Sequence, residues 1–169
     1  MCDEERSYSG PLHYSTIQLT SLVILRVFIG WHFLYEGLVK LFTPYWTSAG
    51  YLVESKWIFS SLFIGIATNP TLLKIVDFLN VWGLIAIGLG LILGCFTRVA
   101  SISGIVLLFL YYICQPPIIG YTYSSPSEGS YLIVNKNLIE MAALFVLTIF
   151  PTGYDIGLDR LIFIKRIKE

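Results

Sequence analysis

The sequence predicts an all-α membrane protein, a bundle of four transmembrane helices with an interfacial or re-entrant segment between the first two. Charged residues make up only 13% of the 169 residues, whereas soluble domains carry about 25%. The mean hydropathy is +0.73. A folded chain of this length still exposes about a third of its surface, so a soluble core cannot hide this shortage of charge. The net charge of zero gives no reason to expect a nucleic-acid partner.

Apolar stretches long enough to cross a bilayer provide the second observation. They are residues 17–42, 75–96, 99–114 and 132–150. About 20 helical residues, each rising 1.5 Å, cross a hydrocarbon core of about 30 Å. The third stretch is short by this measure, and we expect it to extend through "TR" at its start or "QPP" at its end. Prolines stop the third and fourth stretches, because proline lacks an amide hydrogen and clashes with the preceding turn.

The loop between the first two stretches contains the third informative feature, "WIFSSLFIGIA" at residues 57–67. This apolar run is about half a span long, which is typical of interfacial or re-entrant segments rather than of transmembrane helices. We expect it to be helical without crossing the membrane and to cover one end of the bundle. With Trp46, Trp57, Phe59 and Phe63 it would form the apolar wall of a pocket.

These elements predict one four-span membrane domain over residues 16–151. A cytoplasmic tail over residues 1–15 would precede it, and a basic cytoplasmic tail over residues 152–169 would follow. Basic residues in "LDRLIFIKRIKE" favour the cytoplasmic side, so we expect a multi-pass protein of the cytoplasmic (inner) membrane with both termini in the cytoplasm. The acidic start "MCDEERSYSG" lacks the features of a signal peptide, so the first span should be retained.

The first stretch contains ionisable residues at an unusual density. "LRVFIGWHFLYEGLVKLF" carries Arg26, His32, Glu36 and Lys40, which share an arc of about 120° on a helical wheel. A charge inside a span costs several kcal/mol unless it is paired, so this face should meet protein or a cavity. Three simpler readings stay open: Lys40 could extend to the interface, His32 could hydrogen bond to a neighbouring helix, and Arg26 with Glu36 could be structural.

Polar residues of the second and fourth stretches converge on the outer half of this bundle, since both stretches begin at the outer face. They are Lys74, Asp77 and Asn80 in the second stretch, and Asn135, Lys136, Asn137 and Glu140 in the fourth. We expect the inner half to be nearly all apolar. The charged residues of the first stretch would meet Lys136 and Glu140 in one hydrogen-bonded network at the depth of Glu36. The tyrosines at the end of the third stretch fit an interfacial aromatic belt.

The candidate site follows from this convergence. The candidate catalytic residues are His32, Glu36 and Glu140, and the candidate ligand-binding residues are Arg26, Lys40, Asp77, Asn80, Asn135, Lys136 and Asn137. We expect no metal site, and the presence of only two histidines in the whole chain argues against haem ligation. The absence of a C-x-x-C motif argues against thiol–disulfide exchange.

Three segments carry a family resemblance. They are "LRVFIGWHFLYEGLVKLF", the glycine-rich second stretch ending "LGCFTR", and "NKNLIEMAALFVL". With these segments the chain resembles the DoxX-like family of small four-span membrane proteins, from about Leu22 to Phe150. That family often has an acidic residue early in the second span, where this chain offers Asp77 or Asn80. The family name derives from a subunit of an archaeal quinone-reducing oxidoreductase, and some relatives resemble assembly chaperones.

We therefore expect an integral membrane subunit of a quinone-linked oxidoreductase system, with a polar pocket for a quinone. His32 could titrate near neutral pH, Glu36 or Glu140 could exchange protons, and Arg26 or Lys136 could stabilise an anionic form of the ligand. The sequence has no flavin or dinucleotide fingerprint, so a partner subunit would carry the redox cofactors. The alternative is a non-catalytic membrane anchor or assembly subunit, and a transporter ranks third because no inverted repeat is visible.

Overall fold

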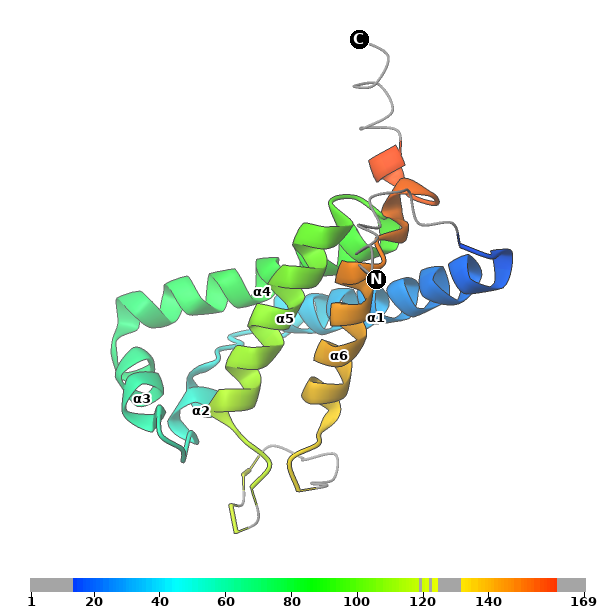
Figure 1. Cartoon of the computed structure of the whole chain (residues 1–169). Coiled ribbons are helices and arrows are strands. Elements are labelled where there is room, and N and C mark those ends of the chain that lie inside the picture. The colour runs from blue at the N-terminus through cyan, green and yellow to red at the C-terminus, as the bar shows by residue number, and fades with distance from the viewer. Residues whose placement is uncertain (1–13, 119, 122, 125–131, 161–169) are drawn as a thin grey trace, which may run out of the picture.

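The computed structural model describes residues 14–118, 120–121, 123–124 and 132–160. The regular structure of these residues is helical, with no extended strand (Figure 1). The prediction of an all-α fold is therefore confirmed. The elements are α1 Thr16–Phe42, α2 Ala49–Val53, α3 Ser60–Thr68, α4 Pro70–Leu93, α5 Thr97–Cys114, α6 Lys136–Ile149 and the short 3-10 helix η1 Thr152–Tyr154.

Three of these helices, α1, α4 and α5, are long and apolar enough to cross a membrane. Their ends follow local capping chemistry. At the start of α1, Ser15 and Gln18 form a capping box, which pairs amide groups that lack partners inside the helix. At the start of α4, the Asn69 side chain accepts from two amides and Pro70 follows directly, so the helix begins five residues before the predicted position 75.

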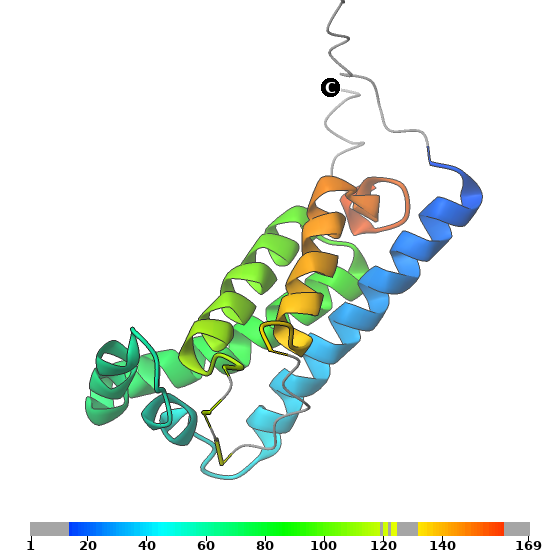
Figure 2. The same ribbon diagram turned by 60° about the horizontal axis from the view of Figure 1, so that its bottom comes forward.

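The fourth predicted stretch forms a shorter helix than expected. Helix α6 begins at Lys136 rather than at residue 132, because the Asn135 side chain accepts a hydrogen bond from Leu138 N at 3.0 Å and caps the helix there. Its 14 residues extend about 21 Å, less than the hydrocarbon thickness of about 30 Å. It runs antiparallel to α5 in both ribbon views (Figures 1 and 2), so the bundle has four main helices, of which three meet the length of a span.

Helix α1 packs closely along α4, and glycines make this approach possible. A Cβ atom on Gly88 would lie 2.5 Å from Leu34 N and 2.7 Å from Gly30 O, both backbone atoms. Small residues allow two helix backbones to come this close. Phe33, Leu91 and Leu144 are almost completely buried in the main core beside this contact.

The loop segment between α1 and α4 folds into α2 and α3 at one end of α4 (Figures 1 and 2). Helix α3 has nine residues, so the prediction of a helix too short to cross the membrane is confirmed. Phe63 of α3 packs in a small core with Leu52 and Cys114. We call this end of the bundle the loop end.

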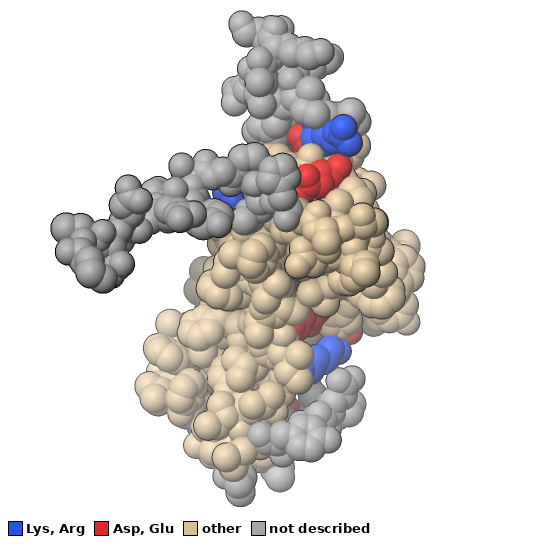
Figure 3. Space-filling model, turned by 45° about the vertical axis from the view of Figure 1, so that its right-hand side comes forward, with Lys and Arg blue, Asp and Glu red and all other residues tan. Residues whose placement is uncertain are grey.

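The other end of the bundle carries the first and last described residues, and we call it the terminal end (Figure 1). The rings of Tyr14 and Phe150 lie edge to face there, with centroids 6.5 Å apart. In Figure 3 one group of charged residues lies at the terminal end, a second, smaller group lies lower on the visible face, and uncharged surface separates the two. Phe28, Phe78 and Phe145 are among the large apolar residues exposed on the helices, as expected for surfaces in contact with lipid.

The prediction that the inner half is nearly all apolar is wrong. At the terminal end Arg26, Thr97, Thr152 and Asp159 are each at most 3% exposed. Arg26 donates to Thr152 Oγ1 at 3.0 Å and to the carbonyl oxygen of Ile156 at 2.8 Å. The polar residues after Pro151 fold back onto the helices, a tertiary contact that the pattern of apolar stretches does not reveal.

Candidate ligand-binding cavity

A cavity of about 890 Å³ lies at the loop end, bordered by α1, α4, α5, α6 and the α2–α3 segment. Small-molecule sites are usually concave, mostly apolar and of about 300–1,000 Å³. Trp46, Phe59 and Phe63 line it, as predicted for its apolar wall. Trp57, the fourth aromatic residue of that prediction, is not among the lining residues.

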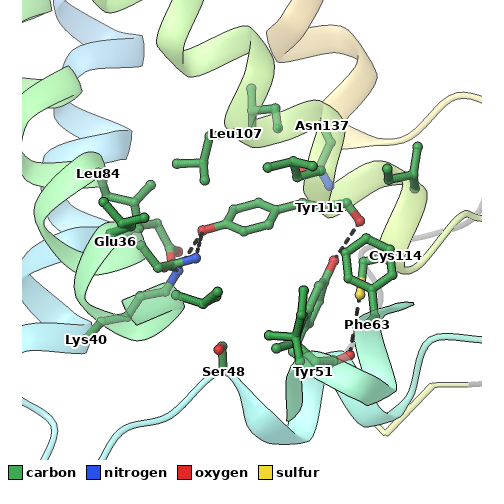
Figure 4. Close-up of a pocket in the computed structure, with 18 of the residues that line it drawn as sticks. Glu36, Lys40, Ser48, Tyr51, Phe63, Leu84, Leu107, Tyr111, Cys114 and Asn137 are labelled. Atoms are coloured by element: carbon green, nitrogen blue, oxygen red, sulfur yellow. Dashed lines mark hydrogen bonds between the residues drawn. The ribbon is translucent and has the colours of Figure 1, made fainter. Parts of the chain in front are cut away.

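Lys40, Asn80 and Tyr111 form the main polar group of the cavity, which we call the Lys40 cluster (Figure 4). The ammonium group of Lys40 donates to Asn80 Oδ1 at 3.1 Å and to the Tyr111 hydroxyl at 3.3 Å. Asn80 Nδ2 also donates to that hydroxyl, at 2.7 Å. The Lys40 Nζ atom lies 5.2 Å from the ring centroids of both Trp46 and Tyr111. Lys40 therefore points into the protein, and the reading in which it extends to the interface is wrong.

His32 and Glu140 form a second polar group, which we call the His32–Glu140 pair. His32 Nδ1 lies 2.7 Å from Glu140 Oε1, joining α1 to α6. The two side chains are 32% and 10% exposed. His32 also lines the cavity. The predicted contact between the charged face of α1 and Glu140 therefore exists, but it involves His32 and not Glu36.

Glu36 lies one helical turn from both His32 and Lys40 and lines the cavity between them. Its carboxylate interacts electrostatically with Lys40 and Tyr111. Of the predicted network between the charged face of α1 and the pair Lys136 and Glu140, the structure shows the contact to Glu140, which His32 makes. Lys136 lines the cavity from the first turn of α6.

The remaining predicted residues divide between the cavity and structural contacts. Asn137 lines the cavity from α6, whereas Asn135 caps that helix. Asp77 accepts hydrogen bonds from Ser48 N at 2.8 Å, Ser48 Oγ at 2.5 Å and Thr47 Oγ1 at 2.8 Å. Asp77 therefore ties α4 to the segment that precedes α2 and does not line the cavity itself.

Arg26 is not brought to the cavity. It shares one face of α1 with Glu36, but ten residues separate the two along the sequence, which is about 15 Å of helix. Its partners Thr152 and Ile156 lie at the terminal end. The helical wheel correctly placed Arg26 on the same face of α1 as Glu36. It carries no information about the position of a residue along the helix axis, and so it could not show that Arg26 lies far from the cavity.

Tyr51 is a cavity residue that the sequence did not single out, whereas Tyr111 was expected at the outer end of the third stretch but interpreted as part of an aromatic belt. The Tyr51 hydroxyl donates to the backbone oxygen of Tyr111 at 3.0 Å (Figure 4). Burial raises the pKa of Tyr51 well above its usual range, so its hydroxyl stays neutral and keeps this hydrogen bond. Gln115 Nε2 donates to the backbone oxygen of Tyr51 at 3.1 Å. A tyrosine at a helix end is typical of an aromatic belt, so only the fold of the α2–α3 segment identifies these contacts.

The fold and the cavity define an integral, all-helical membrane protein with an internal cavity between its helices. The family model of DoxX matches residues 21–114, more than half of the chain. The protein belongs to the DoxX family. The match runs from α1 to the end of α5 and so includes the Lys40 cluster. No curated protein and no solved structure matches the chain.

Proposed function

We propose that this chain is the membrane subunit of a quinone-linked oxidoreductase system and that its cavity holds the head group of a quinone-type ligand. The observation that carries the proposal is the composition of the cavity, which is mostly apolar but has the Lys40 cluster at one wall. A quinone likewise combines a polar part, two carbonyl oxygens on a flat ring, with an apolar tail.

The Lys40 cluster suits a carbonyl oxygen. An ammonium group has three N–H donors, and two of those of Lys40 reach Asn80 and Tyr111. The remaining donor is available to an acceptor on the ligand. The rings of Trp46 and Tyr111 flank the ammonium group and offer aromatic surfaces against which a flat ring can pack.

The apolar walls suit a tail that lies in the bilayer. Leu62 of α3 and Leu79 of α4 line the cavity, and both side chains are more than half exposed. These residues support an opening toward lipid between α3 and α4. A ligand dissolved in the membrane would enter by this route with its tail trailing into the hydrocarbon.

Quinone reduction takes up two electrons and two protons. His32 and Glu36 line the cavity and are residue types that exchange protons in enzyme sites. In this proposal the electrons come from a partner subunit that carries redox cofactors, while the present chain binds the quinone and exchanges its protons.

We also propose four spans with both termini in the cytoplasm of a cytoplasmic (inner) membrane, with α6 as the fourth. Single cysteines placed at positions 6, 54, 128 and 168 of a cysteine-free variant test this topology. A membrane-impermeant maleimide should label intact cells at positions 54 and 128, and should label positions 6 and 168 only after lysis. Labelling of position 168 in intact cells together with protection of position 6 would indicate three spans.

Replacement of Lys40 tests the quinone proposal. The purified protein in lipid nanodiscs is titrated with a decyl-substituted benzoquinone, and binding is followed by quenching of tryptophan fluorescence. We expect Lys40→Met to weaken binding about tenfold or more, because it removes a charged hydrogen bond of about 1.5–3 kcal/mol. Lys74→Met is the matched control, since Lys74 is exposed on the first turns of α4 and does not line the cavity.

Equal binding by the two variants, or no binding by the wild type, would contradict the proposal. The alternative is a non-catalytic membrane anchor or assembly subunit of a larger membrane complex. A stoichiometric partner that purifies with the chain, in the absence of extractable quinone, would favour that alternative.

A further inference from the structure

The Tyr111 hydroxyl carries a hydrogen for which the described residues provide no acceptor. A hydroxyl oxygen can accept two hydrogen bonds and donate one. In the Lys40 cluster this oxygen accepts from Lys40 Nζ at 3.3 Å and from Asn80 Nδ2 at 2.7 Å. Both acceptor positions are therefore used, while no hydrogen bond among the described residues has this hydroxyl as its donor. The O–H hydrogen remains for another partner.

The directions of these hydrogen bonds follow from the chemistry of the groups. An ammonium group only donates, so Lys40 donates to the Tyr111 hydroxyl and to the oxygen of the Asn80 amide. The NH₂ group of Asn80 then faces the hydroxyl and donates to it, since an amide NH₂ group is a donor. The contacts of Lys40 with two aromatic rings, 5.2 Å away, are typical of the charged form of a lysine.

Contacts from several helices hold the Tyr111 side chain at the cavity. Tyr111 lines the cavity from α5, and its partners Lys40 of α1 and Asn80 of α4 line it as well. The rings of Tyr51 and Tyr111 lie edge to face, with centroids 5.9 Å apart. In Figure 4 the Tyr111 ring extends from α5 so that its hydroxyl lies beside Lys40. A donor that is fixed in this way needs little further ordering when a ligand binds.

We propose that the Tyr111 hydroxyl donates this hydrogen to the same carbonyl oxygen of the ligand that Lys40 contacts, so that two donors from α5 and α1 meet on one oxygen. A carbonyl oxygen has two lone pairs and can accept both hydrogen bonds. This inference rests on the proposed function and adds Tyr111 to it as a residue that binds the ligand.

Two consequences follow for the ligand. The two carbonyl groups of a bound quinone become unequal, since one of them accepts from both donors of the Lys40 cluster. The site also selects a carbonyl over an apolar group of similar shape. A ligand without an acceptor at this point would leave the donors of Lys40 and Tyr111 without partners in the cavity, which lowers its affinity.

Infrared difference spectroscopy of a decyl-substituted benzoquinone, bound to the full chain in nanodiscs, tests this inference. The quinone is labelled with ¹³C at one carbonyl carbon or at the other, so that each carbonyl band is identified. A hydrogen bond lowers the stretching frequency of the carbonyl group that accepts it. We expect the wild type to lower the frequency of one carbonyl group clearly more than that of the other.

Tyr111→Phe should remove part of this larger shift, because phenylalanine keeps the ring but has no hydroxyl group to donate. It should also weaken quinone binding about three- to tenfold, as expected for the loss of one hydrogen bond. Tyr112→Phe is the matched control, since the Tyr112 hydroxyl donates to the backbone oxygen of Ile133 at 2.9 Å and Tyr112 is not among the residues that line the cavity. Its carbonyl bands and affinity should equal those of the wild type.

The possible results separate this inference from the proposed function. If Tyr111→Phe and the wild type both bind the quinone and give the same carbonyl bands, the inference is overturned and the proposed function stays intact. A wild type that binds no quinone would overturn both. If Tyr111→Phe does not fold, the wild type still decides, because equal shifts of its two carbonyl bands would contradict a pair of donors on one oxygen.

Discussion

Asp159→Ala should destabilise the protein by about 3–5 kcal/mol, as expected for the loss of a buried, hydrogen-bonded charge. The Asp159 carboxylate accepts from Phe96 N at 2.6 Å, Thr97 N at 3.1 Å and Thr97 Oγ1 at 2.6 Å. It therefore caps the start of α5 from a segment more than 60 residues later in the chain. Its loss would leave these donors buried without an acceptor and would remove a negative charge near Arg26.

Asp155→Ala provides the control, because Asp155 lies in the same segment but is exposed. Thermal unfolding of both variants in the same nanodiscs, followed by intrinsic fluorescence, should give a much lower midpoint for Asp159→Ala. Asp159→Asn should fall between them, since its amide oxygen keeps one acceptor. Similar midpoints for the two alanine variants would show that this capping contact contributes little to stability.

The second large effect is expected at the α1–α4 contact. Gly88→Ala should cost about 3 kcal/mol or more, because the new methyl group would lie 2.5–2.8 Å from Leu34 N, Gly30 O and Leu34 Cα. These are backbone atoms, which cannot move aside as a flexible side chain can, so the two helices would have to separate. The separation would also loosen the packing of Phe33 and Leu91 in the main core.

The matched control is Gly83→Ala on the same helix, where a Cβ atom would have no neighbour within 4 Å. Alanine has a higher helix propensity than glycine, so this change should be neutral or slightly stabilising. The measurement is the unfolding midpoint of the two variants in nanodiscs. A loss of stability of the same size at both positions would mean that close backbone contact does not explain the role of Gly88.

The spans of this fold follow from the sequence because they depend on composition and local caps. The apolar run of α1 and the caps at Ser15 and Asn69 act within a few residues, so pattern reasoning finds them. The predicted length of the fourth span was too long. Residues 132–134 are apolar and so continue the hydrophobic pattern, but Asn135 caps the helix, which begins only at Lys136. Asp159 was missed because a side chain that caps a helix from far along the chain leaves no local pattern.

The candidate site was partly predictable for the same reason. The helical period placed His32, Glu36 and Lys40 on one face, and all three line the cavity. The helical period does not show that Arg26 binds Thr152 at the terminal end, away from the cavity. Nor does it show that the partner of Glu140 is His32 rather than Glu36. Tyr51 enters the site only through the fold of α2 and its contact with α5, which no short-range pattern encodes.

Photoaffinity labelling of membranes that contain the wild-type chain, with an azido-substituted quinone, tests the quinone cavity most directly. Because Phe59, Phe63 and Tyr111 line this cavity, we expect the covalent label in peptides that contain residues 59–66 and 107–114. Excess unlabelled quinone should prevent this labelling. Label confined to peptides outside the cavity lining, or label that excess quinone does not displace, would contradict the proposal that this cavity binds a quinone.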